Sequence, residues 1–193
     1  GFVERYLEEG DVDPGELHAP LEQALREGHL IPILFVSARN GAGVAELLDV
    51  IVKLLPDPSE GNPPQFLKGE GASAVPLAAL PDPSLHVIAH VFKVTQDPYV
   101  GKMGIFRIHQ GTLSRDSQLY IGDGRRPFKV GHLFMLQGKE HVEVAQAFPG
   151  DICAVAKVDE LQFDAVLHDA AEDVGPNALG AALGLNPNRL LTA

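Results

Sequence analysis

The fold is decided by the stretch Asp97-Pro98-Tyr99-Val100-Gly101-Lys102 and by the residues that follow it. Proline fixes its own φ and biases the preceding residue away from helix, so Asp97-Pro98 starts a turn, and Gly101 gives the backbone freedom where the loop ends. The apolar alternation over residues 103–108 then predicts a strand, with Phe106 and Ile108 on one face. Residues 111–116 turn the chain into a further strand, which makes a hairpin of a β domain.

Short β patterns separated by turns repeat through residues 85–172. The predicted strands cover residues 86–94, 103–110, 118–122, 128–136, 141–147 and 151–158. Several short strands with no strong helix between them are typical of a closed or nearly closed antiparallel barrel.

Residues 1–58 have a different pattern, which predicts helix, strand and helix. The first helix follows Asp13-Pro14 and stops at Gly28, and the second starts at Val44 and ends before Pro56. Between them, the continuous apolar run over 30–36 predicts a strand of a parallel sheet. A single strand of this kind has no sheet to join, so this part cannot be a complete doubly wound domain.

Two further segments carry weaker patterns. Residues 59–84 are rich in proline, glycine and small residues and predict a linker between two packing units. Residues 173–193 form a tail of uncertain structure.

The composition excludes several classes of function. The formal net charge of −11 argues against a strong, non-specific nucleic-acid binder, so any RNA contact must be local. The single cysteine, Cys153, argues against a disulfide framework. No apolar run approaches the length of a membrane span and no basic leader is visible, so a cytoplasmic location without membrane contact is expected.

Catalytic and metal-binding motifs are missing from the sequence. The eight histidines are scattered, so no metal site is expected. The sequence has no Gly-x4-Gly-Lys-Ser/Thr phosphate loop, no Asp-x-x-Gly switch motif and no Asn-Lys-x-Asp motif. We therefore expect no catalytic residue, no bound cofactor and no GTP hydrolysis by this chain itself.

The sequence motifs of the β region are nevertheless specific enough to indicate a family. The motif over 97–102, Phe106-Arg107-Ile108, Gly111-Thr112-Leu113 and residues 148–152, Phe-Pro-Gly-Asp-Ile, closely resemble the second domain of elongation factor G, the ribosomal translocase. The resemblance implies that residues 85–172 form a Greek-key β-barrel of the translation-factor domain II type. It also implies that residues 1–58 are the end of a P-loop GTPase domain, an α/β fragment.

The same resemblance implies sites and partners. Ser37, Ala38 and Arg39 match the loop that closes over the guanine base in translational GTPases. The parent protein would bind GTP or GDP with Mg²⁺, hydrolyse GTP on the ribosome, and pack the rest of its GTPase domain against this chain. An ordinary strand-to-helix turn is the competing interpretation of the loop.

A basic rim is expected where the family's barrel contacts small-subunit ribosomal RNA. Its candidate residues are Arg125, Arg126, Lys129, His132 and Lys139. A solvated barrel edge, with lysines that discourage strand addition, is the competing interpretation. The interdomain loop would use Asp97, Tyr99, Gly101 and Lys102.

The chain departs from the family at some positions. Met135-Leu136-Gln137-Gly138 stands where the family usually reads Arg-Met-His-Ala, which loses a positive charge. Such differences fit a divergent paralogue better than the main translocase. The alternative from another class is a stand-alone, non-enzymatic barrel that binds a protein or RNA without nucleotide.

Overall fold

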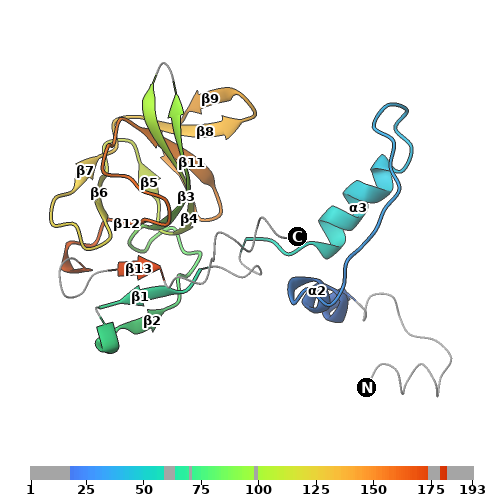
Figure 1. Ribbon diagram of the computed structural model, residues 1–193, viewed down its shortest axis with the longest axis horizontal. Coiled ribbons are helices and arrows are strands. Elements are labelled where there is room, and N and C mark those ends of the chain that lie inside the picture. The colour runs from blue at the N-terminus through green and yellow to red at the C-terminus, as the bar shows by residue number, and fades with distance from the viewer. Residues whose placement is uncertain (1–17, 59–63, 70, 98–99, 174–178, 182–193) are drawn as a thin grey trace. The chain divides into compact units, whose positions relative to one another are not determined.

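The computed structural model describes residues 18–58, 64–69, 71–97, 100–173 and 179–181 (Figure 1). The chain divides into two compact units, Gly1–Pro63 and Pro64–Ala193, and the division lies within the predicted linker. Among the described residues, no helix is long and apolar enough to cross a membrane.

The described residues of the first unit form the helices α2 (His18–Arg26) and α3 (Val44–Leu54). Both were predicted, and Gly28 follows α2 with a φ of 77°, a conformation that glycine adopts without a steric penalty. The predicted strand over 30–36 is wrong for the described part of this unit, because these residues form no β-ladder there. A strand needs a neighbour for its backbone groups, and the described part of unit 1 offers only an isolated bridge between Ser37 and Ala42.

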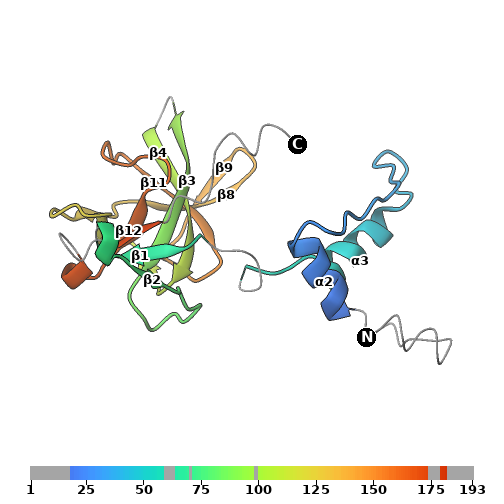
Figure 2. The same cartoon turned by 60° about the horizontal axis from the view of Figure 1, so that its bottom comes forward.

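The second unit is built almost entirely of antiparallel strands (Figures 1 and 2). Its strands are β1 (Phe66–Lys68), β2 (Val75–Leu77), β3 (Ile88–Asp97), β4 (Gly101–Gln110), β5 (Leu113–Ser114), β6 (Gln118–Ile121), β7 (Phe128–Lys129), β8 (Leu133–Gln137), β9 (Glu140–Glu143), β10 (Gln146–Ala147), β11 (Ile152–Ala156), β12 (Val166–His168) and β13 (Leu179–Ala181). Eight of them form one curled sheet in the order β7-β6-β12-β3-β4-β11-β8-β9. This architecture confirms the predicted β-barrel domain.

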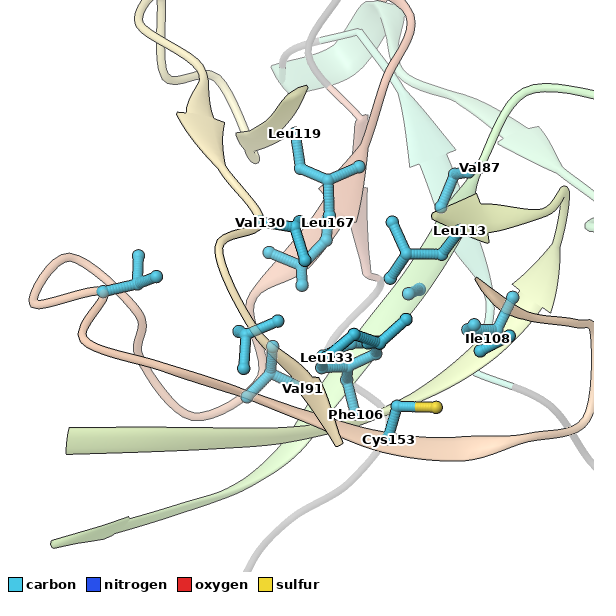
Figure 3. Close-up of a cluster of buried hydrophobic side chains, with 14 of the residues drawn as sticks. Val87, Val91, Phe106, Ile108, Leu113, Leu119, Val130, Leu133, Cys153 and Leu167 are labelled. Atoms are coloured by element: carbon cyan, nitrogen blue, oxygen red, sulfur yellow. The ribbon is translucent and has the colours of Figure 1, made fainter. Parts of the chain in front are cut away.

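The core lies inside the curl of this sheet, and β4 runs through its centre. Phe106 of β4 pairs with Val91 of β3 and Cys153 of β11, and all three side chains are buried together (Figure 3). Phe106 and Ile108 point into the core, which confirms the predicted alternation. Burial raises the pKa of the Cys153 thiol to about 12, so this thiol is an apolar packing group.

Short links hold the two edges of the curled sheet together. The chain after β5 donates from the Arg115 N–H to the Ala145 carbonyl and from the Asp116 N–H to the Val130 carbonyl. Strand β10 pairs with β5 at Leu113 and Ala147. Residues 113–117 therefore bridge the β7 side and the β9 side of the sheet.

A second, three-stranded sheet packs outside the curl, in the order β13-β1-β2. Phe66 of β1 and Leu179 of β13 cover Ile88 and Val166 on the outer face of β3 and β12. Phe66 also meets the ring of His109, edge to face, with ring centroids 5.2 Å apart. Burial first, and then the charges of His90 and Arg107, lower the pKa of His109 to about 4.

This outer sheet corrects two predictions. The linker over 59–84 is wrong for residues 66–68 and 75–77, which form strands, and the uncertain tail over 173–193 contributes a strand at 179–181. Each segment is too short to show a β pattern by itself, and it is stabilised by strand pairing within this sheet and by packing on β3 and β12.

Strand boundaries within the barrel also differ from the prediction. The strands over 128–136 and 141–147 are each divided in two, and β12 was missed. Asp164, with a φ of 67°, precedes β12 and contacts buried His90, with His90 Nε2 and Asp164 Oδ1 2.6 Å apart. This contact and the Val91–Ala165 backbone bond place β12 beside β3, and neither is visible in a local pattern.

Candidate functional site

The loop over 37–43 closes on itself. The Ser37 N–H donates to the Ala42 carbonyl and the Gly41 N–H to the Ser37 carbonyl, both at 2.9 Å. The Asn40 side chain accepts a further bond from the Ala42 N–H at 3.2 Å. No hydrogen bond to another described residue engages the backbone N–H of Ala38 or Arg39. These two exposed positions can offer donors to a ligand, whereas the Ser37 N–H is already used.

The hairpin β3–β4 carries the predicted interdomain loop. Asp97 is the last residue of β3 and pairs with Gly101, the first residue of β4. Gly101 has a φ of 79°. Lys102 is fixed by its side chain, which donates to the Asp159 carbonyl at 2.5 Å, and by its own carbonyl, which accepts from the Lys157 N–H. The loop end of the hairpin is thus tied to the loop that follows β11. Tyr99 lies outside the described residues.

Two of the candidate basic residues lie in the loop between β6 and β7. Residues 122–127, which we call the arginine loop, carry the exposed side chains of Arg125 and Arg126. Neither guanidinium forms an ion pair with any residue in the described part of the chain. Both charges are available to a partner.

Lys129 has a partner within the barrel. Its Nζ lies 2.9 Å from Oδ1 of Asp116, and both side chains are exposed. The hydrogen bond from Lys129, aided by its charge, lowers the pKa of the Asp116 carboxyl, so the carboxylate stays ionised beside the lysine. The pair is locally neutral and offers a phosphate less than a lone lysine would.

His132, like Lys129, contacts a carboxylate of the barrel. Its Nδ1 lies 2.9 Å from Oε1 of Glu143, and Nη1 of Arg115 lies 3.7 Å from the same oxygen. The hydrogen bond from His132 is the main cause that lowers the pKa of Glu143, and the charges of His132 and Arg115 add to it. These residues join the chain after β5 to β9 and form part of the link across the sheet edges.

Lys139 lies in the turn between β8 and β9. Figures 1 and 2 place this turn on the opposite side of the barrel from the arginine loop. The prediction of one basic rim is therefore wrong, because the five residues fall into separate groups. Arg125 and Arg126 form one group, Lys139 stands apart, and Lys129 and His132 are paired with carboxylates.

Comparison with known proteins identifies the β domain. Residues 86–170 match the family described as Elongation factor G domain 2. Proteins from two strains of Mycobacterium tuberculosis, CDC 1551 / Oshkosh and ATCC 25618 / H37Rv, are each called "Elongation factor G-like protein" and are 30% identical to this chain over 187 residues. The β domain thus matches the second domain of elongation factor G, and the chain is similar to elongation factor G-like proteins over most of its length.

Each match covers most of this chain but only a small part of the relative. It includes 89% of this chain and 26% of each M. tuberculosis relative. A crystal structure of a Thermus thermophilus protein matches with a TM-score of 0.61 and 29% identity, over 87% of this chain and 22% of that one. The chain thus spans about a quarter of the length of the relatives it matches.

Sequence reasoning missed two residues of this elongation factor G-like barrel. Arg115 was predicted only as part of a turn, although it lies beside Glu143. His168 was counted among the scattered histidines, although it is buried at the start of the arginine loop. No group of three His, Cys, Asp or Glu side chains suited to a metal ion occurs among the described residues.

Proposed function

We propose that this chain is part of a translational GTPase and that its barrel docks on the RNA of the small ribosomal subunit. The domain 2 match supports a translation-factor role. The observation that carries the RNA contact is the arginine loop, where Arg125 and Arg126 are exposed and lack an ion pair with the described residues. Arginine forks bind phosphate oxygens through two parallel hydrogen bonds.

The charge distribution favours a small, local contact. The chain carries a formal net charge of −11, so RNA would be repelled by most of its surface. Asp116 already pairs with Lys129, and Glu143 already contacts His132. We therefore assign the phosphate contact to Arg125 and Arg126, with Lys139 as a separate contact.

The guanine-facing role belongs to the loop Ser37-Ala38-Arg39. The backbone N–H groups of Ala38 and Arg39 are exposed and can donate to the edge of a base. GTP or GDP and Mg²⁺ would be held mainly by the rest of the nucleotide domain of the full-length parent. That protein would act in the cytoplasm.

The remainder of the GTPase domain is the proposed partner of unit 1. The side chains of Phe35 and Val52 are 92% and 80% exposed, and Ile31 and Ile33 are exposed beside Phe35. An apolar surface of this kind is covered in a stable protein. The rest of a nucleotide domain would cover residues 30–36 and bury these side chains.

The hairpin β3–β4 would brace the barrel against the GTPase domain. The end of this hairpin next to its loop is fixed by the contacts of Lys102 with the loop after β11. A rigid support of this kind would let the barrel respond to the nucleotide state.

Binding to purified small ribosomal subunits tests the RNA contact. We expect the chain to bind them with an affinity that falls as salt rises, because phosphate contacts release counterions. In the variant Arg125→Ala/Arg126→Ala, the slope of log affinity against log salt should be smaller by about two. Co-sedimentation over a series of salt concentrations measures both quantities.

The control for lost charge is Lys53→Ala, because Lys53 is on α3 and is paired with Asp49. This variant should bind like the wild type. Equal salt slopes for the double arginine variant and the wild type would contradict the proposal. A chain that binds a protein or RNA partner, while its full-length parent binds no nucleotide, would support the stand-alone module instead.

A further inference from the structure

His168 is a buried side chain that the proposed function does not use. It is 1% exposed, at the end of β12, where it pairs with Tyr120 of β6. Nε2 lies 3.0 Å from the carbonyl oxygen of Gly122, and Nδ1 lies 3.1 Å from the carbonyl oxygen of Ala170. The Tyr120 ring stacks on the imidazole, with centroids 5.6 Å apart and planes inclined by 22°.

In the contact with Gly122, the ring nitrogen of His168 must be the donor, because the carbonyl oxygen can only accept. A neutral imidazole carries one N–H donor, so the tautomer protonated at Nε2 donates to Gly122, and the imidazolium donates to both carbonyls. A carbonyl shielded from water costs free energy when it lacks a donor, so the part-buried Gly122 carbonyl and the buried Ala170 carbonyl each favour a ring nitrogen that donates to them. The stacked Tyr120 ring helps to fix the plane of the imidazole.

Gly122 is the first residue of the arginine loop, and β12 binds both of its backbone groups. Its N–H donates to the Val166 carbonyl at 2.8 Å, and its carbonyl faces His168. The next turn closes when the Gly124 N–H donates to the Ile121 carbonyl at 2.9 Å. Arg125 and Arg126 follow Gly124 directly, so the backbone that carries them begins at residues held by these hydrogen bonds.

We propose that His168 is a positioning residue that clasps the arginine loop to β12 and so presents Arg125 and Arg126 to phosphate groups. The inference rests on the proposed function for its ligand, the phosphates of an RNA backbone. A loop that is ordered before binding loses less conformational freedom when it binds. His168 therefore contributes to affinity without touching the RNA.

Hydrogen exchange tests the clasp without any ligand. In His168→Leu, the Gly122 carbonyl loses its donor, and the amides of Gly122 and Gly124 should exchange at least about tenfold faster. His168→Gln, whose amide keeps an N–H donor, should restore much of the protection. The Ile108 amide, which donates to Asp151 in another part of the barrel, is the internal control and should not change.

Two exchange results would overturn the clasp. One is unchanged protection of Gly122 and Gly124 in His168→Leu. The other is equal acceleration at Ile108, which would mean that the histidine acts only through global stability.

A double-mutant cycle on small-subunit binding tests the effect on the arginines. His168→Leu should weaken binding of the wild-type chain by about three- to tenfold, as expected for a loop that must be ordered on binding. In the Arg125→Ala/Arg126→Ala background, the same substitution should cause no further loss. An equal loss in both backgrounds would overturn the positioning role. If the wild type binds no RNA while the exchange result holds, the ligand is wrong and the clasp stands.

Discussion

Phe106→Ala is expected to destabilise the barrel by about 3–5 kcal/mol, the largest effect that we expect of any single substitution in this chain. Phe106 is completely buried on β4, between Val91 of β3 and Cys153 of β11 (Figure 3). Removing its ring leaves a cavity at the centre of the curled sheet, where the surrounding strands cannot collapse because they are paired on both sides. The loss combines the transfer free energy of the ring with the cost of the cavity.

Urea unfolding followed by near-ultraviolet circular dichroism, which reports on Tyr120 in the barrel, measures this loss. Phe163→Ala is the matched control, because the Phe163 side chain is 52% exposed and its removal should cost well under about 1 kcal/mol. Similar losses for the two variants would mean that Phe106 is not the centre of the core.

Gly111→Ala is expected to cost about 2–4 kcal/mol through the backbone alone. Gly111 has a φ of 78°, and a Cβ built there would lie 2.7 Å from the Leu85 carbonyl oxygen and from Cα and N of Val87. These are backbone atoms and cannot turn away. The Gly111 N–H also donates to the Asp82 carbonyl, so a shift to relieve the clash would break that bond.

Gly138→Ala separates the two contributions. Gly138 has a φ of 60° in the turn between β8 and β9, and a Cβ there meets nothing within 4 Å. It therefore carries only the cost of the left-handed backbone, about 1–2 kcal/mol. Thermal unfolding of both variants should show the larger loss for Gly111→Ala. Equal losses would show that residues 85–87 are not held against this glycine.

The role of Gly111 explains why the motif Gly111-Thr112-Leu113 was informative. Gly111 allows residues 82–87 to lie against the end of β4, Thr112 donates its hydroxyl to the Pro83 carbonyl, and Leu113 enters the core. The turn and the alternation along β4 are local properties, so the sequence was sufficient to predict them. The barrel followed from several such patterns in a row.

Other elements depend on contacts between distant residues. Strand β1 exists because Phe66 packs on Ile88 and Val166 and because β13 pairs with it. A strand of three residues shows no alternation of apolar and polar residues and no clear turn residues at its ends. It cannot be recognised before its partner strands are known. The opposite error occurred at residues 30–36, where a strong β pattern has no neighbouring strand in the described part of unit 1.

The candidate site likewise combines features that the sequence predicts with contacts between distant residues that it does not predict. Arg125 and Arg126 were candidates because of the resemblance to the family's barrel, and both side chains are exposed in the structure. The pairing of Lys129 with Asp116 did not, because the two residues meet only when β6 and β7 are paired. Likewise, His132 and Arg115 reach Glu143 from separate parts of the chain. Charge patterns in sequence thus located basic residues, and folding decided which of them remain available.

The central claim, that this chain belongs to a ribosome-dependent GTPase, is tested most directly by measuring GTP hydrolysis with the full-length parent protein beside this chain, with and without ribosomes. We expect GTP binding in calorimetry and hydrolysis stimulated by ribosomes for the parent, and neither for the chain, which lacks the phosphate loop. Absence of nucleotide binding by the parent, or hydrolysis that ribosomes do not change, would contradict the account.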